Sequence, residues 1–268
     1  MGSMTFTSPT PSAGPRVALV TGVGRRRSIG AELALGLAAD GWDLALGHWQ
    51  PYDERLGYEQ GADDPGAVAD ACRAMGRRAL LLPGDLSDPA VPEALVASAT
   101  ERLGPVTGLV MSHCESVDSG ILTTSLESWE RHYAVNARAT WLLIRAVAER
   151  LPVLAPGGPP AAHVVALTSD HTAHNLPYGS SKGALDRIVI ASAIELADRG
   201  VRANVVNPGP IDTGWMDDRI RALGVADTPA GRLGTPRDTA DLVRFLLSEQ
   251  GGWINGQLLL SNGGFKTA

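Results

Sequence analysis

The sequence predicts one α/β domain built on a doubly wound, parallel sheet of seven strands. Three observations support this. From Arg16 onward, short β-branched or leucine-rich runs alternate with longer segments whose apolar residues recur every three or four positions, as in repeated strand–helix–strand units. The strand runs are apolar on both faces, which is expected where helices cover both sides of a sheet. No Pro/Gly/Ser-rich linker divides the chain, because the stretch at 155–160 is short enough to be a turn.

Each predicted strand is a short apolar run bounded by polar, Gly or Pro residues. The runs lie at 17–21, 44–48, 79–82, 108–111, 163–168, 202–207 and 257–260. Between them lie segments with helical periodicity, several of them opened by the Ser, Asp or Pro residues that favour helix N-termini. The predicted helices begin near Ser28, Asp64, Asp88, Ser125, Pro177 and Pro236.

Composition limits the classes of partner. The chain has 268 residues, of which 44% are hydrophobic and 19% charged, and 23 basic against 29 acidic residues give a net charge of −6. An acidic protein has no electrostatic footprint for nucleic acid or an anionic membrane. The longest apolar runs, such as 189–191, fall far short of the ~20 residues that span a bilayer. We therefore expect a small-molecule substrate, with no nucleic-acid or membrane partner.

Residues 1–15 are expected to be a disordered tail or tag remnant, with the folded domain spanning 16–268. This start has neither the basic residues nor the apolar core of a secretory signal. Cys72 and Cys114 make no disulfide framework and lie in no metal-ligand spacing. His171 and His174 lie three residues apart, but no third ligand accompanies them, so we expect no metal site. A reducing cytoplasm is the expected compartment.

A Gly-rich turn follows the first predicted strand and leads directly into a helix. It runs from Thr21 and Gly22 through Ser28 and Ile29 to Gly30. Glycines allow the backbone to approach a pyrophosphate, whose charge is met by the free N–H groups at the helix N-terminus. This placement predicts a dinucleotide-binding, Rossmann-type fold.

The cofactor is predicted to be NADP(H). A dinucleotide site for NAD expects an acidic residue ~20 residues after the turn, at the end of the second strand, to bind the ribose 2′-hydroxyl. Here that strand runs into His48 and Trp49, and Asp53 follows four residues beyond Trp49. The arginines at 25–27 instead offer guanidinium groups to a 2′-phosphate. Asp85, after the third strand, either accepts a hydrogen bond from an adenine amino group or caps a turn.

Tyr178 and Lys182 form the predicted catalytic pair. Their spacing of four places them on one face of a helix. A phenol has an unperturbed pKa near 10, so it needs help from a cation to exchange protons at neutral pH. An ammonium one helical turn away is suited to that role.

Taken in order along the chain, these motifs resemble the short-chain dehydrogenases/reductases over about residues 16–265. The resemblance also rests on Asn136, on Ser169 at a strand end and on the segment at 207–213. It implies that Tyr178 is the general acid, Lys182 tunes it and binds the nicotinamide ribose, Ser169 binds the substrate oxygen, and Asn136 holds a relay water. The cofactor-binding residues that it implies are Gly22, Arg25, Arg26, Arg27, Ser28, Ile29, Gly30, Trp49, Asp85, Leu86, Ser112, Tyr178, Lys182, Pro208, Gly209, Ile211 and Thr213.

The chain departs from the pattern of this family in three places. The Gly-rich turn is two residues longer and resembles that of the enoyl-acyl-carrier-protein reductases. The usual Asn-Asn-Ala-Gly after the fourth strand is replaced by Met-Ser-His-Cys at 111–114, so sheet support must come from elsewhere. The loop from Ser169 to Tyr178 is about four residues shorter than usual.

These motifs predict an NADPH-dependent reductase of a ketone or 3-oxoacyl carbonyl, or the reverse reaction. An enoyl reductase is one alternative, although the resemblance gives those enzymes a wider Tyr-to-Lys spacing. A non-catalytic NADP-binding sensor or assembly subunit is the other. The segment 214–232, with Trp215 and Met216, resembles a substrate lid. Apolar residues on two predicted helices, including Trp141, Leu142, Ile188 and Ile194, predict a homodimer or homotetramer.

Overall fold

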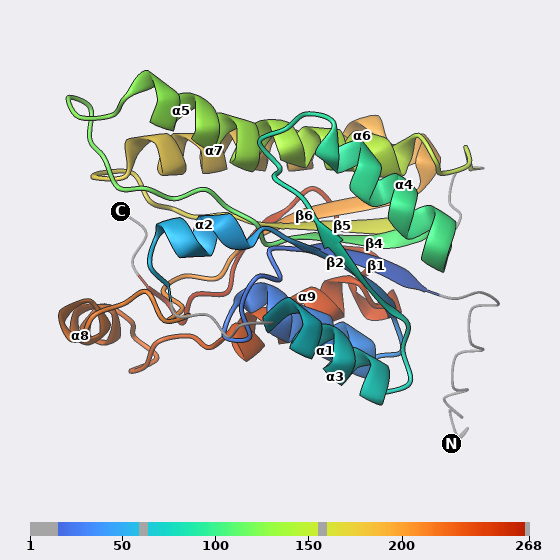
Figure 1. Cartoon of the computed structure of the whole chain (residues 1–268), viewed down its shortest axis with the longest axis horizontal. Helices are drawn as coiled ribbons and strands as arrows, with labels where there is room; N and C mark the ends of the chain where they lie inside the picture. Colours follow the sequence, from blue (N-terminus) through green and yellow to red (C-terminus); the bar gives the residue numbers. More distant parts are fainter. Residues whose placement is uncertain (1–15, 59–63, 155–159, 266–268) are drawn as a thin grey trace, which may run out of the picture.

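The structure, a computed structural model, describes residues 16–58, 64–154 and 160–265. The predicted tail at 1–15 and most of the turn at 155–160 lie outside the described residues. Within them, seven parallel strands form one sheet in the order β3-β2-β1-β4-β5-β6-β7 (Figure 1). The predicted sheet is confirmed, with strand bounds within about two residues of those expected. The strands are β1 (Val17–Thr21), β2 (Asp43–His48), β3 (Ala79–Pro83), β4 (Val106–Met111), β5 (Ala162–Leu167), β6 (Val201–Asn207) and β7 (Leu258–Leu260).

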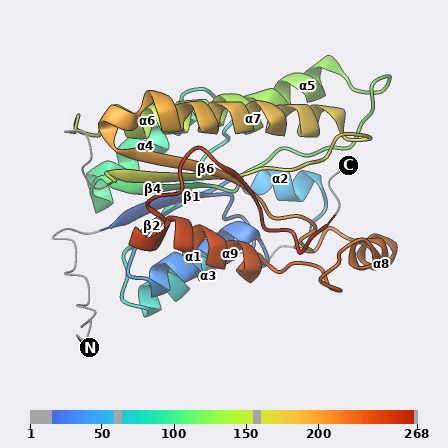
Figure 2. The ribbon, with the colours of Figure 1, turned by 180° about the vertical axis from the view of Figure 1, so that it is seen from behind.

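Helices cover both faces of the sheet (Figures 1 and 2). On one face lie α4 (Val91–Leu103), α5 (Leu126–His132), α6 (Ala139–Ala148) and α7 (Leu176–Glu195); on the other lie α1 (Ile29–Ala39), α3 (Asp64–Ala74) and α9 (Pro236–Leu246). Each face of the sheet packs against its helices in a separate hydrophobic core, and alternate side chains of β1 contribute to the two cores. Val17 and Leu19 pack into the core beneath α4, α6 and α7, whereas Ala18 and Val20 pack into the core beneath α1 and α9.

Local signals in the sequence set several of the helix starts. The Ser28 hydroxyl accepts a hydrogen bond from the Ala31 amide at 3.0 Å and caps α1. Ser125 caps α5 in the same way. Thr235 and Asp238 form a reciprocal capping box at the start of α9. The helix expected near Asp88 begins instead at Val91, because the Asp88 carboxylate accepts a hydrogen bond from the Ala90 amide in the preceding turn.

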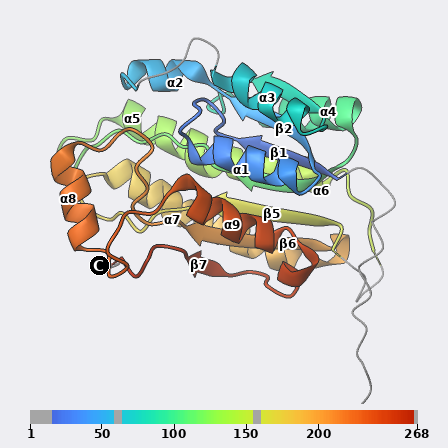
Figure 3. The ribbon, with the colours of Figure 1, turned by 90° about the horizontal axis from the view of Figure 1, so that it is seen from below.

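Two short helices lie beyond the carboxyl ends of the strands, α2 (Gln50–Arg55) and α8 (Asp218–Ala226) (Figure 3). The sequence did not predict α2. The chain reverses its winding direction between β1 and β4, which are adjacent in the sheet. Such a switch point opens a crevice at the carboxyl ends of the strands, where ligands bind in folds of this type. Among the described residues, no helix combines the length and apolarity needed to cross a membrane.

Candidate active site

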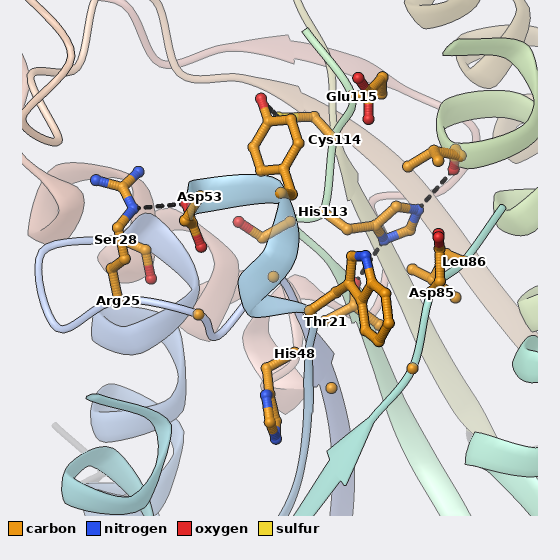
Figure 4. A pocket seen from close by; sticks show the side chains of 18 of the residues that line it. Thr21, Arg25, Ser28, His48, Asp53, Asp85, Leu86, His113, Cys114 and Glu115 are labelled. Carbon is orange, nitrogen blue, oxygen red and sulfur yellow. Dashed lines mark hydrogen bonds and ion pairs between the residues drawn. The ribbon is translucent and has the colours of Figure 1, made fainter. Parts of the chain in front are cut away.

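A cleft opens at the carboxyl ends of β1 to β4, at the switch point, with a volume of about 950 Å³ when the open solvent at its mouth is included (Figure 4). Nine of the predicted cofactor-binding residues line it: Gly22, Arg25, Ser28, Ile29, Trp49, Asp85, Leu86, Ser112 and Thr213. The other eight predicted cofactor-binding residues do not line it: Arg26, Arg27, Gly30, Tyr178, Lys182, Pro208, Gly209 and Ile211. The lining also includes residues that the sequence did not single out for this cleft, namely His48, Tyr52, Asp53, Glu115 and Arg131.

The Gly-rich turn is packed closely enough to require its glycines. Gly22 has a φ of +80°, and a Cβ there would lie 2.7 Å from the backbone of Ser112. A Cβ on Gly30 would collide with the carbonyl group of Gly22. The turn therefore brings bare backbone and the N-terminus of α1 to the cleft, which is the geometry of an anion site.

The three arginines of the turn are not equivalent. The Arg25 Nε lies 2.8 Å from Asp53 Oδ1, and its Nη1 donates to the Thr213 carbonyl at 2.7 Å. Arg26 points away from the cleft, with 67% of its side chain exposed, and pairs with Asp64 at 3.3 Å. The Arg27 guanidinium lies beside Gly214. The structure therefore does not bring the three arginines together to face a 2′-phosphate, because Arg25 and Arg26 are paired with carboxylates.

Asp85 has both a turn-capping role and an ionic partner. Its Oδ1 accepts a hydrogen bond from the Ser87 amide at 2.9 Å, and its carboxylate pairs with Arg131 at 3.3 Å. Burial alone would raise the pKa of this carboxyl, but the hydrogen bonds from Ser87 and the charge of Arg131 outweigh it and lower the pKa. Arg131 also pairs with Glu115, a buried carboxylate that contacts Arg55 of α2.

His113 supplies the sheet support that the missing asparagine would have given. Its Nδ1 lies 2.7 Å from the Thr21 hydroxyl of β1, and its Nε2 lies 3.0 Å from the carbonyl of Val135. A neutral ring satisfies both contacts, accepting from the hydroxyl and donating to the carbonyl. Burial, together with the nearby Lys182 ammonium, lowers the pKa of His113 to about 3. The imidazole therefore stays neutral and links β1 to the helical segment that carries Asn136.

Asn136 lies in a π-helical stretch, Tyr133–Arg138, that joins α5 to α6. Its amide is fully buried. The Oδ1 accepts from the Glu115 amide at 2.8 Å, while Nδ2 donates to the Glu115 carbonyl and to the Ser181 hydroxyl, both at 2.9 Å. The side chain thus clamps the segment after β4 to α7. Its amide is committed to protein partners, and the predicted role of holding a relay water stays a prediction.

Tyr178 and Lys182 lie in the first turns of α7, as predicted. The Lys182 ammonium is buried, donates to the Leu167 carbonyl at 2.8 Å and lies 5.8 Å from the centre of the Tyr178 ring. Burial raises the pKa of Tyr178, and the nearby Ser169 hydroxyl, which acts to lower it, only partly offsets this effect. Burial lowers the pKa of Lys182. The expected lowering of the phenol's pKa is therefore not present in this structure.

Cys114 connects this catalytic group with the cleft. Its side chain lines the cleft, and it is close enough to influence the pKa values of Tyr178 and Lys182. The shortened loop at 169–175 closes over the start of α7. The His171 ring meets the Tyr178 ring edge-on at 6.5 Å, and a Cβ on Gly179 would collide with the His171 carbonyl. Ser169, Tyr178 and Lys182 thus form one cluster beside the cleft.

The segment after β6 returns toward the same edge. Asn207 accepts a hydrogen bond from the amide of Gly209, whose φ of +67° favours glycine. Thr213 lines the cleft, whereas Ile211 is buried and does not line it. Met216 is buried and Trp215 is 47% exposed, while α8 has no buried residue. A loosely packed α8 beside the cleft fits the lid hypothesis for 214–232.

In the described part of the chain, no three His, Cys, Asp or Glu side chains are grouped so that they could hold a metal ion.

Comparison with known proteins agrees with this geometry. Residues 22–266 match the protein family described as enoyl-(acyl carrier protein) reductase. The short-chain dehydrogenase/reductase eriH of Hericium erinaceus is 32% identical, with 92% of this chain and 96% of the relative covered. The NADPH-dependent aldehyde reductase-like protein of Arabidopsis thaliana chloroplasts is 31% identical, with 96% of each covered.

Among solved structures, a blue fluorescent protein from a metagenomic library, crystallised in complex with NADPH, is 31% identical. The two structures superpose with a TM-score of 0.80 over 93% of this chain and 97% of the other. Together, the fold, the order of the motifs and these matches show that the chain belongs to the short-chain dehydrogenase/reductase family of oxidoreductases.

Proposed function

We propose that this protein is an NADP(H)-dependent oxidoreductase that reduces a ketone or 3-oxoacyl-type carbonyl to an alcohol, or runs the reverse reaction. One observation carries the proposal. Tyr178, Ser169 and Lys182 form a single cluster beside the cleft at the carboxyl edge of the sheet, with the Lys182 ammonium 5.8 Å from the centre of the phenol ring and the Ser169 hydroxyl near enough to lower the phenol's pKa. This is an acid, an oxygen-binding hydroxyl and a cation in one place, as carbonyl reduction requires.

The cleft fits a nicotinamide dinucleotide. The close-packed glycines and the N-terminus of α1 offer donors to a pyrophosphate, and the cleft extends from there past Asp85 and Leu86 to Cys114, next to the catalytic cluster. The NADPH in the name of the Arabidopsis relative and in the solved structure supports the phosphorylated cofactor. When bound, the reduced cofactor supplies the hydride.

The chain's own residues handle the proton and the substrate oxygen. Because burial raises the pKa of Tyr178, the phenol is protonated at neutral pH and can donate its proton to the developing alkoxide. The Ser169 hydroxyl donates a hydrogen bond to the same oxygen and orients it. Lys182, anchored on the Leu167 carbonyl, keeps a positive charge near the phenolate that remains after proton transfer.

The spacing of the acid and the cation favours carbonyl over enoyl chemistry. Tyr178 and Lys182 are four residues apart on α7, and the resemblance gives enoyl reductases a wider spacing. The Gly-rich turn and the description of the matched family favour the enoyl alternative. A cofactor-binding sensor without activity is the third candidate, motivated by the altered segment at 111–114.

NADPH oxidation distinguishes the three. The purified chain is assayed with a panel of aldehydes, ketones and 3-oxoacyl thioesters, and in parallel with 2-enoyl thioesters, with NADH as the alternative cofactor. Turnover of a carbonyl substrate supports the proposal. Turnover of enoyl thioesters alone replaces it with the enoyl-reductase alternative, and tight NADPH binding without turnover on any substrate favours the sensor.

Two further expectations accompany the proposal. Trp141 is 49% and Ile194 is 75% exposed on α6 and α7, while Leu142 and Ile188 are half-buried, which supports a homodimer or homotetramer formed through these helices. The free cysteines Cys72 and Cys114 and the use of NADPH favour a reducing compartment such as the cytoplasm.

A further inference from the structure

The short helix α2 lies along the cleft and makes three contacts with two parts of its rim, the Gly-rich turn and the segment after β4. Asp53 pairs with Arg25 of the Gly-rich turn. The Tyr52 hydroxyl lies 3.9 Å from the Cys114 thiol, and Arg55 pairs with Glu115. Figure 4 shows the labelled ends of this arrangement, with Asp53 facing Arg25 on one side and Cys114 and Glu115 on the other. Of these contacts, only the one with Arg25 involves the turn that is shaped to receive phosphate.

The Arg25–Asp53 pair is well enclosed. The two side chains are 11% and 9% exposed, and the Arg25 guanidinium also lies 4.6 Å from the centre of the Tyr58 ring. The second oxygen of Asp53 lies 2.5 Å from where a Cβ on Gly24 would be. The carboxylate is therefore pressed against the backbone of the Gly-rich turn, inside the cleft.

A cofactor phosphate and the Asp53 carboxylate would compete for hydrogen bonds from the same Arg25 guanidinium. Both are anions that accept hydrogen bonds from a guanidinium fork, and the carboxylate already lies against Gly24 and Arg25 of the turn that is shaped to receive the phosphate. The interaction with Arg25 does not fully offset the cost of burying the charged Asp53 carboxylate. Burial raises the pKa of Asp53 even though the Arg25 charge and hydrogen bond act to lower it. Transfer of the Arg25 guanidinium from Asp53 to a phosphate is therefore feasible.

We propose that Asp53 lowers the affinity for the cofactor by competing with a cofactor phosphate for Arg25, so that binding transfers the guanidinium from the carboxylate to the phosphate. The inference rests on the proposed function, since it assumes a nicotinamide dinucleotide in this cleft. The phosphate is either the pyrophosphate, common to both cofactors, or the 2′-phosphate, present only in NADP(H). In the case of the 2′-phosphate, Asp53 also affects the choice between NADP(H) and NAD(H), from a position outside the second strand.

The test is a double-mutant cycle on cofactor dissociation constants. Binding of NADPH and of NADH is followed by cofactor fluorescence for the wild type, Asp53→Asn, Arg25→Met and the double variant. Asp53→Asn should tighten NADPH binding by about tenfold, since it frees a charge-assisted hydrogen bond. Arg25→Met should weaken binding, and Asp53→Asn should have no effect in the Arg25→Met background, because the competition acts through Arg25.

A matched control is available in the same turn. Asp64 pairs with Arg26, but neither residue lines the cleft. Asp64→Asn removes a carboxylate charge from a more exposed pair with the same turn and should leave both dissociation constants unchanged. Asp53→Ser serves as a second variant if Asp53→Asn does not fold. If Asp53→Asn tightens the binding of NADPH but not of NADH, the competing group is the 2′-phosphate. If it tightens the binding of both cofactors, the competing group is the pyrophosphate.

Several outcomes would overturn the proposal. Weaker NADH binding in Asp53→Asn would show that the carboxylate holds a ribose hydroxyl instead. Equal tightening with and without Arg25 would show direct repulsion of the phosphate, with no exchange. Unchanged affinity would remove any role for Asp53 in binding. Wild-type protein that binds neither cofactor is a different result, because it contradicts the proposed function before Asp53 is tested.

Discussion

Replacing His113 by Ala should destabilise the protein strongly, because this ring joins the centre of the sheet to the π-helical segment. The imidazole is 8% exposed and bridges the Thr21 hydroxyl, at 2.7 Å, and the Val135 carbonyl, at 3.0 Å. Both partners are themselves buried. Truncation leaves two buried polar groups without their partner, and each such group costs about 1–3 kcal/mol.

The magnitude follows from these two groups and the space left by the ring. We expect a loss of about 3–4 kcal/mol in the free energy of unfolding for His113→Ala. For a domain of this size that corresponds to a fall in Tm of about 10 °C. His113→Gln places an amide near the position of Nε2, so it can keep the bond to the Val135 carbonyl and should recover about half of the loss.

The pH dependence of stability provides a second readout. The pKa of His113 is lowered to about 3 by burial, from an ordinary value of 6.5. Below pH 6.5 the unfolded chain therefore binds a proton that the folded protein does not bind, and stability falls as the pH falls. Between pH 8 and pH 5 this single group costs about 2 kcal/mol. The Gln variant lacks this contribution, whereas the lowered pKa values of His132 and His163 act equally in both proteins.

Denaturant unfolding at pH 8 and pH 5 measures both effects for the wild type, His113→Ala and His113→Gln. The wild type should lose about 2 kcal/mol more than the Gln variant on acidification. A His113→Ala protein within about 1 kcal/mol of the wild type at pH 8 would refute the structural role. Identical pH dependence in the wild type and the Gln variant would refute the neutral, buried state of the ring.

Three further predictions concern the cofactor, the catalytic cation and assembly. Changing the arginines at 25–27 together to Ala should reduce a preference for NADPH over NADH in dissociation constants through the loss of Arg25, which alone of the three lines the cleft; equal affinities in the unmodified protein would contradict it. Lys182→Ala should reduce both turnover and cofactor affinity, with oxidative turnover partly recovered at high pH; unchanged affinity would exclude a contact with the ribose. Light scattering at micromolar concentration should give the mass of a dimer or tetramer, with Trp141→Glu shifting it toward the monomer, and a monomeric wild type would be the opposing result.

The sequence was most informative where local patterns decide the structure. The apolar runs predicted all seven strands of the described sheet; the central strands need continuous apolar sequence because both their faces are buried, whereas the edge strand β7 is apolar but largely exposed. Ser28 marked the start of α1 through a cap that depends only on neighbouring residues. The spacing of Tyr178 and Lys182 placed both on α7 beside the cleft. All three features depend on short sequence separations.

The sequence was least informative where distant residues meet. Nothing near Arg25 indicates that its partner is Asp53, 28 residues away on a helix that was not predicted. Pro51 in the first turn of α2 was the available signal for that helix. The role of His113 depends on Thr21 and Val135, which come from two other elements. Partners of this kind are fixed by tertiary packing and have no local pattern.

The most direct test of the proposed mechanism is to measure the turnover and the cofactor affinity of Tyr178→Phe with a carbonyl substrate found in the panel. The substitution removes the proton donor and keeps the ring that packs against His171. Turnover should fall by about 10²–10⁴-fold, the range typical of losing a general acid, while the NADPH dissociation constant should stay within about twofold of the wild type. Near-normal turnover in Tyr178→Phe would contradict the assignment of Tyr178 as the acid and, with it, the proposed mechanism.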